Sequence, residues 1–239
     1  MYLQWIRSNE HDIFFKDNYR MGVRNFARFV EFVSPSLQGN FSHDLAIAVW
    51  LDWVTSGDSV RRQESRFHLS IGTIQHYRST VCDAVIRTFQ SKYLNKHRDE
   101  EWCRHQSIYW ESKEPAFGDG CIGAADGTNI PVVCRESMKS RMRCRKGCTC
   151  TNVLAACDGQ KRFFYILAGW EGSASDARIF NNSALKRELK PGNWLLLDGG
   201  YGFMLQGLVP YRGVRYHLRE YASTAIGRPQ NPKELFNYR

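Results

Sequence analysis

Cys121-Ile-Gly-Ala-Ala-Asp-Gly-Thr-Asn-Ile130 is the stretch that decides the fold of this chain, and Trp194-Leu-Leu-Leu-Asp-Gly-Gly-Tyr201 has the same design. Each is a run of apolar or small residues that places one carboxylate, Asp126 or Asp198, at its end, with a glycine directly after it. Two such acids form the smallest scaffold that holds a hard cation through oxygen ligands. We therefore expect two strands that bring Asp126 and Asp198 together.

The sequence between these stretches predicts how they meet. Two apolar runs, 151–157 and 162–168, flank Asp158-Gly159, which is a strong hairpin signal. A helix is predicted to begin within 172–180, and a crossover through it can return the last strand beside the first, parallel to it. The two acids then lie at neighbouring strand ends despite the 71 residues between them. The predicted fold class is α/β.

The segment 42–92 predicts three helices, two short and one longer. The boundary residues are Gly57 at the end of the first, Asp58 or Ser59 before the second and Ser70 before the third. This order is typical of a helix-turn-helix, whose third helix lies in the major groove of DNA, here with Arg78 facing outward. A plain helical bundle explains the same spacing, and both interpretations stay open.

The chain of 239 residues is long enough for one sizeable core and a smaller module. We expect an N-terminal helical segment at 1–41, a helix-turn-helix-like module at 42–92, a connector of mixed charge at 93–117 and a nuclease-type domain at 118–239. No apolar run approaches the roughly 18 residues that span a bilayer. Eight cysteines without a secretory signal are typical of reduced intracellular thiols.

Positive charge is concentrated in the second half of the chain. Residues 119–239 hold 18 lysines and arginines against 10 aspartates and glutamates, whereas residues 1–118 hold 15 against 14. Such an excess suits a polyanion such as DNA, because neutralised phosphates release condensed counterions. A basic surface without a partner is the alternative.

Six basic residues follow the first acidic stretch closely: Arg135, Lys139, Arg141, Arg143, Arg145 and Lys146. They are candidates for phosphate contacts, with a solvated loop as the alternative. The same run is a weak nuclear import pattern. Cys144, Cys148 and Cys150 lie in or beside it, but they lack the paired spacing of structural zinc sites, so we do not expect zinc there.

Several further motifs occur in a fixed order: Ala125-Asp-Gly-Thr-Asn-Ile130, Asn152-Val-Leu-Ala-Ala-Cys-Asp158, Ala168-Gly-Trp-Glu-Gly-Ser-Ala-Ser-Asp-Ala-Arg178, Asp198-Gly-Gly-Tyr201, Pro210-Tyr-Arg-Gly-Val-Arg-Tyr-His217 and Asn231-Pro-Lys-Glu-Leu-Phe-Asn237. Over about residues 118–239 the chain resembles the transposases and transposase-derived nucleases of the PIF/Harbinger superfamily, which are DDE superfamily endonucleases. The region 42–90 resembles the DNA-binding part of that family more weakly.

The resemblance implies an RNase H-like mixed sheet with flanking helices and a nuclease that depends on Mg²⁺ or Mn²⁺. It makes Asp126 the first catalytic, metal-binding acid and Asp198 the second. Asp176 matches a recurrent aspartate with an auxiliary role, although a first-turn helix residue stabilised by the helix dipole explains it too. DNA as substrate, a separate Myb-like DNA-binding partner and a nuclear location are also implied.

The chain departs from the family pattern at two places. Asn129 stands where the family usually has histidine. The family's third acid lies on a helix after the Pro-Lys-Glu-Leu-Phe-Asn motif, so we expect the chain to stop at Arg239 before that acid. Glu234 is a weaker candidate for the third ligand. Two further hypotheses therefore stay open: a catalytically inactive DNA-binding protein derived from a transposase, and an incomplete copy that does not fold stably.

Overall fold

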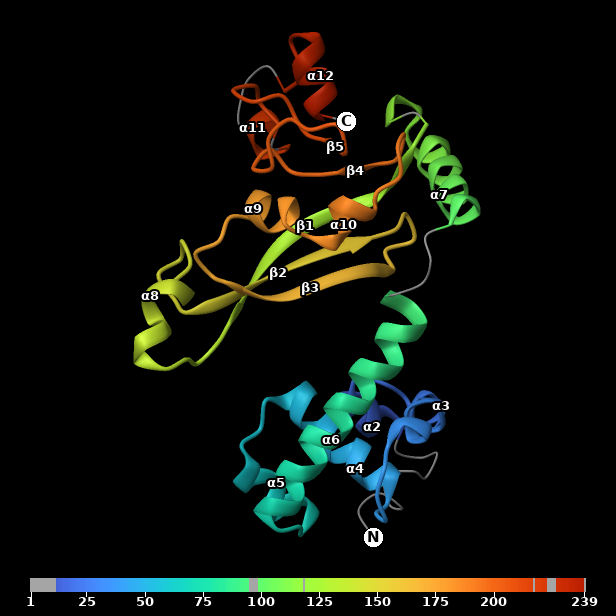
Figure 1. Ribbon diagram of the computed structural model, residues 1–239, viewed down its shortest axis with the longest axis vertical. Helices are drawn as coiled ribbons and strands as arrows, with labels where there is room; N and C mark the ends of the chain where they lie inside the picture. The colour runs from blue at the N-terminus through green and yellow to red at the C-terminus, as the bar shows by residue number, and fades with distance from the viewer. Residues whose placement is uncertain (1–11, 95–98, 118, 217, 223–226, 239) are drawn as a thin grey trace. The chain divides into compact units, whose positions relative to one another are not determined.

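The structure is a computed structural model that describes residues 12–94, 99–117, 119–216, 218–222 and 227–238. It divides into two compact units, Met1–Tyr93 and Leu94–Arg239, and each is described by itself (Figure 1). Among the described residues, no helix has the length and apolar content to cross a membrane.

The first unit is helical. Its elements are α2 (Asp12–Tyr19), α3 (Val23–Val33), the 3-10 helix η2 (Ser34–Ser36), α4 (His43–Ser56), α5 (Val60–Phe67), α6 (Ile71–Phe89) and the π-helical turn η3 (Gln90–Leu94). The three helices predicted for 42–92 are thus confirmed. Their first residues follow Ser42, Ser59 and Ser70, whose side chains each accept a hydrogen bond from a first-turn N–H group. Fully buried Phe15, Phe26 and Ile74 belong to the core between the helices.

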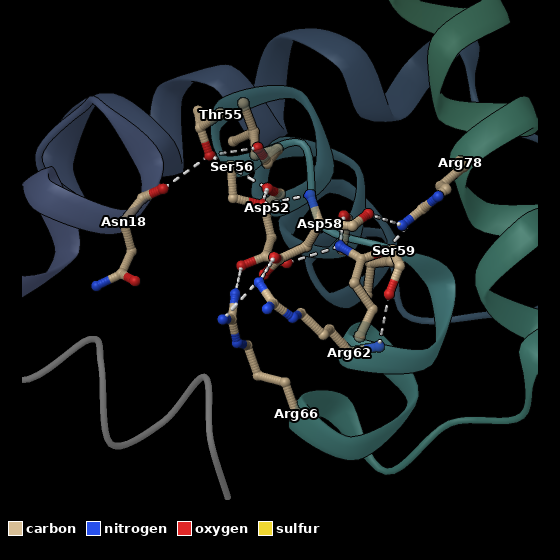
Figure 2. A network of polar contacts seen from close by, with 12 residues as sticks. Asn18, Asp52, Thr55, Ser56, Asp58, Ser59, Arg62, Arg66 and Arg78 are labelled. Atoms are coloured by element: carbon tan, nitrogen blue, oxygen red, sulfur yellow. Dashed lines mark hydrogen bonds and ion pairs between the residues drawn. The ribbon is translucent and has the colours of Figure 1, made fainter.

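A polar network joins α4, α5 and α6 (Figure 2). The carboxylate of Asp52, only 1% exposed, accepts hydrogen bonds from Arg66 and from Gln63. Asp58 pairs with Arg62 at 3.1 Å and with Arg66 at 3.1 Å. The hydrogen bond from Arg62 is the main cause that holds the pKa of Asp58 below its usual range. These ion pairs fix the two short helices to each other.

Arg78 does not face outward as the sequence analysis predicts. Its Nε donates to Gln63 Oε1 at 2.8 Å, another guanidinium nitrogen donates to Asp58 O at 2.9 Å, and the guanidinium lies 4.9 Å from the Trp53 ring centroid. Burial lowers the pKa of Arg78, and nearby acids oppose that shift. The side chain therefore helps to hold the bundle together, because the acids of α4 and of the turn before α5 attract it inward. A helix-turn-helix that reads DNA, and the DNA contact of Arg78, stay predictions.

The second unit is a mixed α/β domain around one sheet (Figure 1). Its strands are β1 (Cys121–Pro131), β2 (Cys150–Cys157), β3 (Phe163–Glu171), β4 (Trp194–Leu196) and β5 (Gly207–Leu208). Its helices are α7 (Glu100–Lys113), η4 (Pro115–Phe117), η5 (Glu136–Met138), α8 (Lys139–Met142), α9 (Asp176–Asn181), α10 (Ala184–Glu188), α11 (Leu218–Ala222) and α12 (Pro232–Tyr238).

The sheet order is β3-β2-β1-β4-β5, with β1, β2 and β3 antiparallel in succession and β4 parallel to both β1 and β5. This mixed sheet with flanking helices is consistent with an RNase H-like fold. The predicted hairpin at 158–159 and the predicted parallel return of the last strand are both confirmed. Apolar residues of α9 and α10, such as Phe180 and Leu185, join Leu154 and Leu195 of the strands in one core.

Two features of this unit differ from expectation. Strand β1 does not end at Asp126 but continues to Pro131, since β2 supplies hydrogen-bond partners along that whole length, as far as the pair Pro131–Cys150. The segment 93–117, predicted as a connector, contains the 14-residue helix α7. Asp99 caps this helix, and buried Cys103 contributes to the core of the second unit.

Candidate active site

The parallel pairing of β1 and β4 positions the two predicted acids. Ala124 of β1 is paired with Leu196 of β4. Asp126 lies two residues beyond this pair within β1, on the same face of the strand as Ala124. Asp198 also lies two residues beyond the pair, just after the end of β4. The register of β1 and β4 therefore agrees with the expectation that Asp126 and Asp198 follow neighbouring strand segments.

Each carboxylate is oriented by the backbone of a glycine that follows it. Gly127 N donates to Asp126 Oδ1 at 2.8 Å, and Gly200 N donates to Asp198 Oδ1 at 2.9 Å. The described residues provide no other hydrogen bond to either carboxylate, so Oδ2 of each is available for a ligand. Glycine suits these positions because its bare backbone can approach the acid closely.

The acids also act on one another through their charges. Burial raises the pKa of Asp126, the N–H group of Gly127 opposes this, and the negative charges of Asp198 and Asp176 raise the pKa further. Carboxylates that repel one another become favourable together when a cation lies between them. Their oxygen atoms are the ligands that Mg²⁺ and Mn²⁺ prefer, so the residues present fit a divalent cation.

Asp176 is held beside β1 by contacts with two strands. It is the first residue of α9, after the capping Ser175. Asn152 Nδ2 of β2 donates to Asp176 Oδ1 at 2.7 Å. The same Oδ1 would lie only 1.9 Å from a Cβ atom built on Gly127, so the carboxylate occupies the space where any other side chain at that position would be. The packing explains why a glycine must follow Asp126.

Sequence reasoning gave no role to Asn152 or Tyr201, although both lie in quoted motifs. Asn152 is 2% exposed within an otherwise apolar strand, and a polar residue buried in this way is a signal by itself. Tyr201 is 4% exposed. Burial raises the pKa of its hydroxyl, and the charges of all three aspartates raise it further. Tyr201 therefore lies where the fields of the three carboxylates overlap.

A cavity of about 450 Å³ opens next to the second acid. It is lined by Gly199, by residues 210–216 and by Glu220. Arg212, an exposed residue of this lining, contributes a positive charge to the cavity wall, which also includes Gly199, the residue directly after Asp198.

Glu234 is occupied by contacts within its own segment. Its carboxylate forms an ion pair with Arg215 at 2.8 Å and accepts a hydrogen bond from Gln230 N at 2.8 Å. The hydrogen bond from Arg215 is the main cause that lowers the pKa of Glu234. These contacts fasten α12 to the chain before it and give Glu234 a structural role. Glu234 as a third metal ligand stays a prediction.

The six basic residues of the predicted phosphate contact are all exposed. They lie between β1 and β2, around η5 and α8. Two of them have acidic partners, since Lys139 pairs with Glu136 and Arg141 with Glu171. The structure brings them onto one connecting segment, which we call the basic segment (residues 135–146).

Within the described part of the chain, no cluster of three or more His, Cys, Asp or Glu side chains is arranged to hold a metal ion.

Comparison with known proteins supports the class of the second unit. Residues 125–236 match a family model described as DDE superfamily endonuclease. The match covers Asp126, Asp176 and Asp198 together, and it supports a transposase-like nuclease at the level of this superfamily. Searches of curated proteins and of solved structures found no significant match.

Proposed function

We propose that the chain is a DNA endonuclease of the PIF/Harbinger transposase type that cleaves or transfers phosphodiester bonds with the help of a divalent metal ion. The observation that supports this proposal is the parallel pairing of β1 and β4, since Asp126 and Asp198 each follow the paired residues Ala124 and Leu196 by two positions. These positions lie inside the segment that matches the DDE endonucleases.

Asp126 and Asp198 are the proposed ligands of Mg²⁺ or Mn²⁺, and Asp176 is auxiliary to them. When bound, the cation supplies Lewis-acid stabilisation of the reacting phosphodiester and activates the attacking water. The chain keeps the carboxylates in fixed directions through the N–H groups of Gly127 and Gly200. Asn152 does the same for Asp176.

The substrate side of the proposal rests on charge. The basic segment and Arg212 bind phosphates of the DNA backbone, because both present exposed cations on the unit that carries the acids. A nuclear location and a Myb-like partner belong to this proposal through the resemblance to the family alone.

Cleavage of supercoiled plasmid by the purified chain tests the function. We expect nicking with Mn²⁺ or Mg²⁺, and none with a chelator. Asp126→Asn and Asp198→Asn should each lower the rate by orders of magnitude, as the loss of a main electrostatic element does. Asp83→Asn, at an exposed position of α6, is the control and should cleave normally. Metal-dependent cleavage that persists in both site variants would falsify the assignment.

The second candidate is a DNA-binding protein that has lost catalysis. The observation that favours it is the Arg215–Glu234 ion pair, which occupies the last acid considered as a third ligand. A chain that melts cooperatively and binds DNA, but shows no metal-dependent nicking, would establish this candidate. Glu234→Gln distinguishes the roles further: we expect it to lower stability and to leave any cleavage rate unchanged.

A further inference from the structure

A turn at the end of the basic segment, just before β2, places Cys144 and Cys148 opposite each other. Cys144 N donates to Cys148 O at 2.9 Å, and Gly147 N donates to Cys144 O at 2.9 Å. Gly147 has φ +81°, a conformation that glycine adopts without strain. Arg143 and Thr149 form an antiparallel bridge on the outer side of this turn. The backbone thus fixes both thiols on facing arms of one tight hairpin.

The two sulfur atoms are already close. Cys144 Sγ lies 3.3 Å from Cys148 Sγ. A disulfide bond is about 2.05 Å long, so closure requires roughly an ångström of side-chain movement. Cys148 is exposed, whereas Cys144 is 5% exposed. The pair therefore combines one thiol that solvent molecules can reach with one sheltered partner.

Neighbouring thiols favour the charged form of Cys144. Hydrogen bonds from Cys150 and then Cys148 lower the pKa of Cys144 to about 7, against the effect of burial. The pKa values of Cys148 and Cys150 are raised, that of Cys150 to about 11 and mainly by burial. A thiolate at Cys144 is therefore populated near neutral pH, beside the thiol of Cys148.

We propose that Cys144 and Cys148 are a modification site that forms a reversible intramolecular disulfide, with glutathione disulfide as the oxidant. The Cys148 proton passes to the Cys144 thiolate, and the Cys148 sulfur attacks one sulfur of glutathione disulfide. The first glutathione leaves as a thiolate and takes the proton from Cys144. The Cys144 thiolate then attacks the Cys148 sulfur and expels the second glutathione as a thiolate. One protein thiol and one protein thiolate are oxidised, and one glutathione disulfide is reduced.

Cys150 does not take part in this reaction. It is fully buried in β2, and its Sγ lies 3.3 Å from Asn129 Oδ1. The ring that Cys144 and Cys148 close contains Arg145 and Lys146, two cations of the basic segment. Oxidation therefore restrains the loop that presents these cations, whether or not the chain proves to be a nuclease.

Mass spectrometry of the full 239-residue chain tests the proposal. The reduced protein is equilibrated in glutathione buffers of rising oxidised fraction, quenched with acid and alkylated with N-ethylmaleimide. We expect the loss of two alkylation sites without a glutathione adduct, a peptide pair linked through Cys144 and Cys148, and full reversal by dithiothreitol. Cys148→Ser should abolish the linked pair, whereas Cys82→Ser and Cys134→Ser should leave it unchanged.

The exposed position of Cys148 makes its serine variant a safe test, since little packing is lost. A thermal melt that matches the parent chain confirms this. A link through Cys150, a glutathione adduct that remains on Cys148, or no loss of alkylation at any buffer ratio would each overturn the proposal.

Discussion

The charged form of Asp126 is less favourable in the folded chain than in the unfolded chain. Burial raises its pKa, and the charges of Asp198 and Asp176 add to that shift. The acids repel one another until a counter-charge arrives, as is common where function opposes stability.

We therefore expect Asp126→Asn to make the metal-free chain more stable, because it removes the repulsion among the acids. The gain is limited to about 1 kcal/mol, since solvent reaches the incompletely buried side chain and screens its charge. The same change should remove the rise in melting temperature that Mn²⁺ gives the parent chain. Thermal melts with and without Mn²⁺ measure both effects. A variant that still gains stability from Mn²⁺ to the parent extent would contradict Asp126 as a ligand.

Gly127 is a second position in the site, and packing against Asp176 restricts the residue type there. A methyl group there would collide with Asp176 Oδ1, at a distance of 1.9 Å. We expect Gly127→Ala to lower the free energy of unfolding by about 1 to 3 kcal/mol, as overpacking does. Gly199→Ala is the matched control beside Asp198, because its added methyl finds Pro210 at an ordinary 3.5 Å.

Urea denaturation of both glycine variants gives the comparison. In the double variant Gly127→Ala/Asp176→Ala we expect the two effects to be strongly non-additive, since removal of the carboxylate also removes the collision. Additive effects would mean that Gly127 matters for a reason other than Asp176.

At the scale of elements, local sequence signals account for much of the fold. The helices α4, α5 and α6 were predictable because serine caps and a terminal glycine mark their ends. The β2–β3 hairpin was predictable because Asp158-Gly159 separates two apolar runs. Signals of this kind are encoded within a few residues.

Features with distant causes could not be predicted in the same way. The outer half of β1, after Gly127, is exposed, and it is a strand because β2 runs beside it. The role of Asn152 depends on Asp176, which lies 24 residues further along the chain. The inward direction of Arg78 depends likewise on acids of other elements. Asp126 and Asp198 could be proposed as the main acids from sequence because each follows an apolar run.

The network of α4, α5 and α6 makes the first unit sensitive to acid. Its Asp58 has a lowered pKa, chiefly through the Arg62 hydrogen bond. The stabilisation is fully present above the unfolded pKa of about 3.9 and is lost as the pH falls through the lower folded value.

We expect Asp58→Asn to lower stability near neutral pH by about 1.5 to 3 kcal/mol and to flatten the acid limb of the stability curve. Hydrogen exchange of amides in α4 to α6, corrected for intrinsic rates, reports this unit separately from the second. Asp83→Asn, on the exposed side of α6, is the control and should keep the parent pH profile. An unchanged acid limb in Asp58→Asn would show that other carboxylates set it.

At the scale of the whole molecule, the excess positive charge and the three aspartates of the candidate site belong to the same unit. The net charge is +9, and the excess lies in residues 119–239, with the three aspartates of the site. Affinity for duplex DNA should therefore fall steeply with salt.

Neutralising Arg141, Arg143 and Arg145 together should reduce the slope of log affinity against log salt by up to about three units. Arg24→Gln with Arg28→Gln, at exposed positions of the first unit, should change it less. Fluorescence anisotropy at several salt concentrations measures the slopes. Equal losses in the two sets of variants would mean that binding follows net charge and not the basic segment.

The unexpected length of β1 has a geometric consequence for DNA. From Asp126 to Pro131 the strand advances five residues, roughly 17 Å at about 3.3 Å per residue. Phosphates of one DNA strand advance about 3.4 Å per step, so this length corresponds to about five base pairs. The basic segment begins just beyond. Under the proposed function, a duplex that lay along β1 with its scissile phosphate at Asp126 would contact the basic segment about half a helical turn to one side of the cut. The footprint of the protein on DNA would then be asymmetric about the cleavage point.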